Sequence, residues 1–289
     1  MNIPLKTGIA GFSMPVFGMG TWMIGGETER NPANNDERDI IALRYALHKG
    51  VTHIDTAEMY ADGHCETLVG LAISGFDRSK LFLASKVWNT NLRHDDVLRS
   101  FEFSLKRLGT DYLDLYMIHK PNLEIGMQET FKALNRLVTE KTVRHIGVSN
   151  FSTDRLCSAL NMSENPIVVN QVHYNLIYRE PERSGLTEFC RRNNILISAW
   201  RPIQKGLIAD STSQLMRELT EKYNKSHAQI AINWLISQQK TVTISTMRTQ
   251  KHLDDNLDAL NFSMDQSDIE RLTNDYPGQQ DVSDRVPLS

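Results

Sequence analysis

Four side chains of this sequence have the chemistry to bind an oxygen atom and protonate it: Asp55, Tyr60, Lys86 and His119. Lys86 should lower the pKa of the Tyr60 phenol from about 10 toward the range of a useful general acid, because a nearby cation favours the phenolate. His119 could donate a hydrogen bond to a carbonyl oxygen and stabilise the negative charge that develops on it. Asp55 and Lys86 have opposite charges and could form an ion pair. These residue types favour an electrophilic pocket for an oxygen that gains charge.

Eight apolar runs rich in Val, Ile, Leu and aromatic residues could supply the strands that position these side chains. Between most of the runs, apolar residues recur at three- and four-residue spacing, as from Ile40 to Leu47, which is typical of amphipathic helices. This alternation predicts an α/β fold with parallel strands, and eight units favour a closed (β/α)8 TIM barrel over the competing open, doubly wound sheet. The predicted strands are Val16–Trp22, Val51–Asp55, Leu81–Lys86, Leu113–His119, Val143–Ser149, Ile167–Val172, Ile195–Trp200 and Thr241–Thr246.

Asp55, Lys86 and His119 each end one of these runs. For any one of them, simple solvation is the more common reason for a polar residue at a strand end. The joint pattern is more informative, because the carboxyl ends of barrel strands and the loops that follow them build the active-site face. We therefore expect the three side chains to lie on one face of the barrel.

The segments outside the eight units are short. The segment Leu5–Phe17 contains two glycines and a proline and could form a β-hairpin that closes the bottom of the barrel. A short helix is expected at Asp265–Asn274, followed by a polar, irregular tail from Pro277 to Ser289. Residues 1–289 are predicted to form a single (β/α)8-barrel domain.

The composition is that of an ordinary globular protein. Hydrophobic residues make up 40% and charged residues 23%, and the net charge of −3 is spread along the chain, which argues against nucleic-acid binding. The three cysteines are widely spaced, which suits reduced thiols better than disulfides, and no ligand spacing points to a metal. Without a signal-like segment or a run of about 18 apolar residues, a cytoplasmic protein with no membrane contact is expected.

Seven segments spread over nearly the whole chain resemble motifs of the aldo-keto reductase family, in the order and spacing of that family. The resemblance implies a barrel that binds an extended nicotinamide dinucleotide without a Rossmann fold. The sequence agrees, because Gly18-x-Gly20 lacks the third glycine of the dinucleotide fingerprint. The segments are GTW at 20–22, IDTAEMYADGHCE at 54–66, SKVW at 85–88, LDLYMIHKP at 113–121, IGVSNF at 146–151, NQVHYN at 170–175 and Arg248 to Asn256.

The resemblance implies a role for each of the four residues named first. Tyr60 would be the general acid, Asp55 and Lys86 the pair that tunes it, and His119 the residue that orients the carbonyl. A larger set would bind the cofactor: amide and hydroxyl side chains for the carboxamide, an aromatic ring for stacking on the nicotinamide, and a glycine turn for the pyrophosphate. This set comprises Gly20, Thr21, Ser149, Asn150, Gln171, Trp200, Gly206, Leu207 and Thr246.

The adenosine end departs from the commonest family pattern, in which an Ile-Pro-Lys-Ser sequence supplies a lysine for the 2′-phosphate. The matching residues 244–247 are Ile, Ser, Thr and Met. Bacterial members carry an arginine two places later, and Arg248 stands there before a helix that Thr249 can cap, which favours NADPH. NADH is a second candidate, because Arg248 could instead be a solvated surface residue. The resemblance places Asp255 and Asn256 at the adenine.

Trp22 and Trp88 lie beside catalytic strand ends and are candidates for the substrate pocket, although core packing is the simpler interpretation. Arg201 and Lys120 stand at positions where the family usually has other residues, and they could favour an acidic or polar substrate. The resemblance to short bacterial members implies NADPH-dependent reduction of a small aldehyde or ketone, such as methylglyoxal or an aromatic aldehyde, by a monomer or small homo-oligomer.

Two other functions compete with this one. Some family relatives are nicotinamide-binding regulatory or auxiliary subunits with slow turnover, and an intact catalytic group does not exclude that role. A barrel hydrolase or isomerase that uses Asp55 or Glu58 is the second alternative, but it leaves the combination of Tyr60, Lys86 and His119 unexplained.

Overall fold

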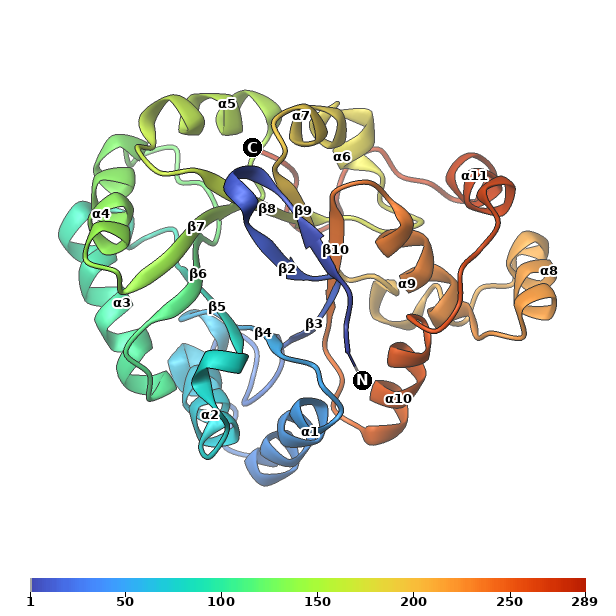
Figure 1. Cartoon of the computed structure of the whole chain (residues 1–289), viewed down its shortest axis with the longest axis horizontal. Coiled ribbons are helices and arrows are strands. Elements are labelled where there is room, and N and C mark those ends of the chain that lie inside the picture. Colours follow the sequence, from blue (N-terminus) through green and yellow to red (C-terminus); the bar gives the residue numbers. More distant parts are fainter. Residues whose placement is uncertain (1) are drawn as a thin grey trace.

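The computed structural model, which describes residues 2–289, is a closed barrel of parallel strands ringed by helices (Figure 1). The strands pair in chain order, and the last one closes the barrel against the first. The predicted (β/α)8 TIM barrel is thus confirmed, and the open doubly wound sheet is not formed. The barrel strands are β3 (Phe17–Gly20), β4 (His53–Asp55), β5 (Phe82–Val87), β6 (Leu113–Ile118), β7 (Val143–Ser149), β8 (Ile167–His173), β9 (Leu196–Trp200) and β10 (Thr241–Ser245).

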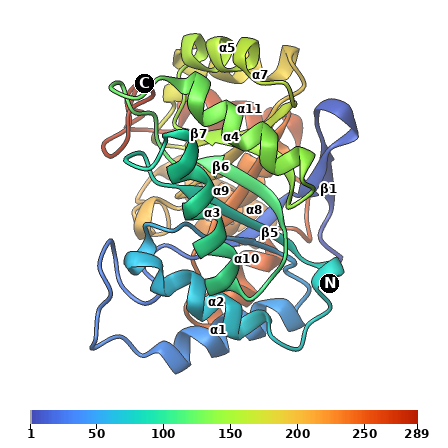
Figure 2. The same cartoon turned by 90° about the vertical axis from the view of Figure 1, so that its left-hand side faces the viewer.

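Helices connect the strands and cover the outside of the barrel, as Figures 1 and 2 show. Their apolar faces turn inward: Val97, Phe101 and Leu108 of one long helix are all buried. Local signals fix helix ends, as where the Asn35 side chain accepts a hydrogen bond from the Arg38 amide. The helices are α1 (Asp36–His48), α2 (His64–Ile73), α3 (His94–Leu108), α4 (Met127–Thr139), α5 (Thr153–Met162), α6 (Glu180–Arg183), α7 (Leu186–Arg192), α8 (Gln214–Tyr223), α9 (His227–Ser237), α10 (Gln250–Asp258) and α11 (Gln266–Asp275).

The predicted N-terminal hairpin is confirmed and lies across one opening of the barrel (Figure 1). Its strands β1 (Leu5–Thr7) and β2 (Ser13–Pro15) pair antiparallel. Phe12 and Met14 are buried in a core cluster with residues of the barrel interior, and Phe12 packs against Phe82, the first residue of β5. The hairpin therefore plugs the end where the strands begin and leaves the opposite end for chemistry.

The barrel interior is tightly packed at His53 of β4. A Cβ at Gly18 of the neighbouring strand would lie 2.3 Å from His53 Nδ1, so only glycine fits there. The imidazole is fully buried, and among the described residues neither ring nitrogen has a hydrogen-bond partner. Burial lowers the pKa of His53 to about 4, so the ring is neutral in the fold.

The segment after α11 is irregular, as predicted, yet it is anchored by hydrogen bonds. The Glu180 carboxylate at the start of α6 accepts from the Ser283 amide at 2.9 Å and from the Leu288 amide at 3.1 Å. The Ser289 amide donates to the Asn150 carbonyl at 3.2 Å, just after β7. The tail is therefore fastened next to the carboxyl end of a barrel strand. Within residues 2–289, no helix is long and apolar enough to span a membrane.

Candidate active site

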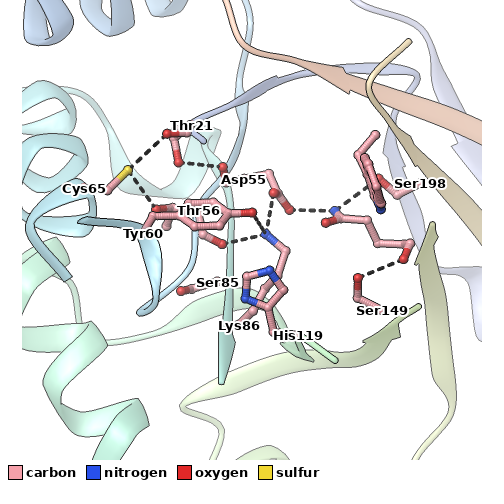
Figure 3. A network of polar contacts seen from close by, with 12 residues as sticks. Thr21, Asp55, Thr56, Tyr60, Cys65, Ser85, Lys86, His119, Ser149 and Ser198 are labelled. Atoms are coloured by element: carbon pink, nitrogen blue, oxygen red, sulfur yellow. Dashed lines mark hydrogen bonds and ion pairs between the residues drawn. The ribbon is translucent and has the colours of Figure 1, made fainter. Parts of the chain in front are cut away.

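The Lys86 ammonium is the centre of a buried cluster at the carboxyl ends of β4 and β5 (Figure 3). It donates to Asp55 Oδ1 at 2.6 Å, to the Thr56 carbonyl at 2.8 Å and to the Tyr60 hydroxyl at 3.4 Å. Both charged side chains are at most 1% exposed. The expected Asp55–Lys86 ion pair therefore forms, and it lies directly beside the phenol.

Burial and charge act in opposite directions on this cluster. Burial alone would lower the pKa of Lys86, but the Asp55 carboxylate and the Tyr60 phenol outweigh it and raise that pKa, so the ammonium stays charged. Burial raises the pKa of Tyr60, and the Lys86 charge opposes this without cancelling it. The prediction that Lys86 brings the Tyr60 pKa below its ordinary value is thus wrong, because enclosure has the larger effect. Tyr60 is a protonated phenol with a cation beside its oxygen.

His119, which follows β6, lies next to the Tyr60 ring. The two ring centroids are 5.4 Å apart in an edge-on arrangement, and His119 Nδ1 is buried without a hydrogen-bond partner in the described part of the chain. Burial, assisted by the Lys86 charge, holds the pKa of His119 well below its ordinary value. A neutral imidazole therefore stands beside a protonated phenol, and both can donate a hydrogen bond to one oxygen.

The two indoles predicted to line a substrate pocket flank these rings. Trp22 packs edge-on against Tyr60 with centroids 5.0 Å apart, and Trp88 packs in the same way against His119 at 5.1 Å. The Glu58 carboxylate accepts the Trp88 amide at 2.5 Å and the Asn91 side chain at 3.1 Å. Glu58 therefore fixes the start of the segment that carries Trp88, a role for which the sequence gives no local signal.

Polar side chains continue from Asp55 across the ends of β7 and β8. Gln171 Nε2 donates to Asp55 Oδ2 at 2.9 Å, and the Ser149 hydroxyl donates to the Gln171 carbonyl at 2.8 Å. Asn150 Nδ2 donates to Ser149 Oγ at 2.9 Å and to the His119 carbonyl at 3.1 Å. We call Ser149, Asn150 and Gln171 the polar shelf. It links the buried cluster around Lys86 to β7 and β8.

Trp200 at the end of β9 completes this edge of the site. Its indole nitrogen donates to Asn150 Oδ1 at 3.3 Å, and one ring face stacks on His173 with centroids 4.1 Å apart and planes 7° from parallel. Burial lowers the pKa of His173 to about 4, and its ring nitrogens bond to Ser283 and Gln204 at 2.8 Å each. The sequence alone does not single out His173. Its position two residues after Gln171 on one strand was the available signal that it supports the site.

Residues 16–275 match the model of the aldo/keto reductase family. The chain belongs to this family. It is similar to glyoxal reductase of Bacillus subtilis strain 168, with 33% identity over 91% of this chain and 89% of the relative, and to methylglyoxal reductase YeaE of Escherichia coli K12, with 33% identity over 92% of each. The chain is therefore an oxidoreductase, and the hydrolase or isomerase interpretation is wrong.

Solved structures of the family have the same fold. A thermostable aldo-keto reductase in complex with the inhibitor epalrestat aligns with a TM-score of 0.91 and 41% identity, over 94% of this chain and 99% of that one. An aldo-keto reductase from Klebsiella pneumoniae in complex with NADPH aligns with a TM-score of 0.85 and 31% identity, over 97% of each chain. At these identities the likeness extends beyond the barrel topology to the family itself.

In this aldo/keto reductase, the Arg248 side chain is 33% exposed and is also hydrogen-bonded within the chain. Its guanidinium donates from Nε to Asp39 Oδ1 at 2.7 Å, from Nη2 to Asp39 Oδ2 at 3.0 Å and from Nη2 to Asn34 Oδ1 at 2.7 Å. Thr249 caps α10 as predicted, with its hydroxyl accepting the His252 amide at 3.2 Å. Sequence reasoning missed Asp39, which lies 209 positions from Arg248.

The two residues expected at the adenine also have partners within the chain. Asp255 accepts from Ser226 and from Gln229 Nε2, the latter at 2.9 Å, while the buried Asn256 side chain donates to Ser245 Oγ at 3.4 Å. These bonds join the start of α9 to the second half of α10, and α10 to the end of β10. Contact with adenine stays a prediction for both residues.

The remaining residues expected to bind the cofactor lie in two places. Gly20, Thr21 and Thr246 lie at the carboxyl ends of β3 and β10, and Gly206 and Leu207 lie after β9. The Thr21 hydroxyl donates to the Asp55 carbonyl at 3.0 Å, and a Cβ at Gly20 would lie 3.5 Å from Thr246 Oγ1 across the β3–β10 pair. Gly206 has a φ of 98° and precedes Leu207, which is 65% exposed. Gly20, Thr21 and Thr246 thus lie together, whereas the turn at Gly206 and Leu207 belongs to the loop after β9.

Arg201 follows Trp200 directly and is partly buried. Its guanidinium lies 5.4 Å from the centre of the Trp200 ring and 3.9 Å from the Asp284 carboxylate of the tail. Burial and the nearby Arg285 lower the pKa of Arg201. This places a positive charge at the rim of the site. Among the described residues, no hydrogen bond or ion pair assigns a role to Lys120. Among residues 2–289 there is no group of three or more His, Cys, Asp or Glu side chains that could hold a metal ion.

Proposed function

We propose that this enzyme uses NADPH to reduce the carbonyl group of a small aldehyde or ketone, such as methylglyoxal or an aromatic aldehyde. The observation that carries the proposal is the Tyr60 hydroxyl, 3.4 Å from the Lys86 ammonium and beside the neutral His119 ring. Relatives named for the reduction of glyoxal and methylglyoxal support the substrate class. The Klebsiella pneumoniae relative in complex with NADPH supports the cofactor.

The chain offers groups that fit a nicotinamide next to the proton donor. Trp200, which is partly exposed and stacks on His173, supplies the aromatic ring on which a nicotinamide could stack. The polar shelf of Ser149, Asn150 and Gln171 presents amide and hydroxyl groups of the kind that hold a carboxamide. When bound, the cofactor supplies the hydride that adds to the carbonyl carbon.

The side chains of the cluster act on the carbonyl oxygen. Tyr60 and His119 donate hydrogen bonds that place the oxygen and stabilise its developing charge. Tyr60 then transfers its proton to this oxygen, and Lys86 stabilises the phenolate that remains. Asp55 holds the ammonium in place through a 2.6 Å hydrogen bond. The products are an alcohol and the oxidised cofactor.

Tyr60→Phe tests the proposal because it keeps the ring and removes the hydroxyl that would donate the proton and that accepts a hydrogen bond from Lys86. With saturating NADPH, we expect kcat for methylglyoxal and for a panel of aromatic aldehydes to fall by about a hundredfold or more. The decrease in NADPH absorbance gives the rate. Tyr112→Phe is the matched control, since that hydroxyl bonds the Arg78 carbonyl away from the cluster, and its rate should equal that of the wild type.

Two results would contradict the proposal. Wild-type rates that Tyr60→Phe leaves unchanged would exclude Tyr60 as the proton donor. A wild-type protein that binds NADPH but oxidises it only in one slow turnover with every carbonyl compound would instead favour the regulatory or auxiliary subunit.

A further inference from the structure

Asp39 of α1 is a buried carboxylate that the proposed reaction does not use. It is 0% exposed, and its two oxygens accept four hydrogen bonds. Two come from Arg248, one from Asn34 Nδ2 at 2.9 Å and one from the Gly25 amide at 3.2 Å. The fold thus builds a complete set of donors around one negative charge.

Three elements bring this set together. Asp39 lies in the first turn of α1, Arg248 lies between β10 and α10, and Gly25 and Asn34 belong to the loop between β3 and α1. Gly25 has a φ of 80°, and a Cβ on it would lie 3.0 Å from the His64 ring, so the loop can approach here only with glycine. The carboxylate is therefore held in position by backbone as well as by side chains.

Asp39 occupies one of the two edges through which the Arg248 guanidinium can bind an anion. Nε and Nη2 form a fork that binds a carboxylate or phosphate through two parallel bonds, and Asp39 accepts from it at 2.7 and 3.0 Å. A phosphate could still approach the guanidinium, because the arginine side chain is 33% exposed. It would then meet a guanidinium already paired with a carboxylate, and the carboxylate would repel it.

We propose that Asp39 determines cofactor selectivity by neutralising Arg248, so that the 2′-phosphate adds little affinity and the enzyme binds NADH nearly as well as NADPH. The proposal rests on the proposed function, since it takes Arg248 to be the residue nearest the 2′-phosphate. It assigns Asp39 a role that the residue exerts through Arg248, and not through direct contact with the reacting atoms.

The test is cofactor binding by quenching of tryptophan fluorescence, without any carbonyl substrate. For the wild type, we expect the Kd values for NADPH and NADH to lie within about tenfold of each other. Asp39→Asn keeps the size of the side chain and one oxygen for the Gly25 amide but removes the charge. It should tighten NADPH binding by about fivefold and leave NADH within about twofold of its wild-type value.

Two further variants show whether the effect runs through Arg248. The double variant Asp39→Asn/Arg248→Gln leaves no unpaired charge, so it should fold, and it should lose the gain in NADPH affinity. Asp254→Asn is the matched control: it removes an equal charge from α10, where Asp254 pairs with Lys49 at 2.9 Å. The ratio of the two Kd values should not change in this control.

Each contrary result has a distinct meaning. If Asp39→Asn weakens NADPH binding, or leaves the Kd ratio unchanged while its melting temperature stays near that of the wild type, the selectivity role is overturned and the proposed reduction stands. A wild-type preference for NADPH of about a hundredfold or more would overturn it in the same way. If no variant binds either cofactor, the proposed function fails as well.

Discussion

The Tyr60 hydroxyl has a cation beside it and protein around it, and these two surroundings affect its pKa in opposite ways. Enclosure has the larger effect, so the pKa lies above its ordinary value. Such a phenol keeps its proton at neutral pH and gives it up only when a stronger base forms next to it. The oxygen of a carbonyl that receives a hydride is such a base. Lys86, whose ammonium lies 3.4 Å from the hydroxyl, would then stabilise the phenolate. These surroundings suit Tyr60 to donate a proton during carbonyl reduction.

The pKa directions predict a flat pH profile for carbonyl reduction. In the proposed mechanism reduction needs Tyr60 protonated, and the raised pKa of Tyr60 means that activity should be lost only as pH rises past about 10. The pKa of His119 lies well below its ordinary value, so this ring should not titrate near neutrality either. We expect kcat/KM to be level from about pH 6 to about pH 9 in steady-state assays. A decline between pH 6.5 and 8 that disappears in His119→Gln would show that His119 titrates in that range and would contradict this reading.

At the scale of elements, the loop between β4 and α2 sets the position of the tyrosine. The amides of Ala61 and Asp62 donate to the carbonyls of Glu27 and Thr28 at 2.7 and 2.8 Å, so this loop is paired to the loop between β3 and α1. Ala61 and Asp62 have φ values of 51° and 53°, a strained conformation for residues other than glycine. The position of the Tyr60 hydroxyl therefore depends on two loops that are hydrogen-bonded to each other.

Glu58 of the same loop should affect substrate binding more than chemistry. Glu58→Ala removes the acceptor of the Trp88 amide, which lies 2.5 Å away, and frees the indole that packs on His119. We expect KM for aromatic aldehydes to rise by about three- to tenfold with kcat changed by less than about twofold, because Tyr60 and Lys86 keep their contacts. Glu58→Gln should recover most of the affinity, since its amide oxygen can accept the same bond. A fall in kcat with KM unchanged would instead place Glu58 in the chemical step.

The elements show what could be predicted from the sequence and what could not. Asp55, Lys86 and His119 could be placed on one face because each ends an apolar run, and parallel strands end together. The pairing of Asp39 with Arg248 could not be predicted, because the two residues are 209 positions apart and the spacing of apolar residues reports only on local structure. The direction of the Tyr60 pKa was also missed, since enclosure depends on packing that spacing along the chain does not reveal. The role proposed for Tyr60 as proton donor comes from the resemblance to the family.

At the scale of the whole molecule, closing the barrel buries the imidazole rings of His53 and His173. The N-terminal hairpin covers one end of the barrel, and the C-terminal tail is bonded at the other. His53 is buried in the interior, and His173 is buried next to Ser283 of the tail. Burial lowers the pKa of each ring to about 4, from 6.5 in an exposed histidine. The unfolded chain therefore binds protons at mildly acidic pH that the folded chain does not, which links the stability of the barrel to pH.

The sign of this linkage predicts acid sensitivity. Stability from a histidine with a depressed pKa is fully present above pH 6.5 and is lost as pH falls toward about 4. At pH 5 each of the two rings should cost on the order of 2 kcal/mol of unfolding free energy relative to pH 8. Urea unfolding at the two pH values, followed by tryptophan fluorescence, measures the difference. His53→Leu should reduce that difference by about 2 kcal/mol, whatever its effect on stability at pH 8, because its side chain cannot bind a proton.

His252→Gln separates this effect from a general loss of charge at low pH. His252 is an exposed histidine on α10, so the variant should keep the wild-type difference in unfolding free energy between pH 8 and pH 5. An equal pH dependence in the wild type and in His53→Leu would mean that His53 takes up a proton inside the folded barrel. A protonated His53 would need a hydrogen-bond acceptor, but neither of its ring nitrogens has a partner among the described residues. The barrel interior would also have to be packed less tightly than the contact between His53 and Gly18 implies.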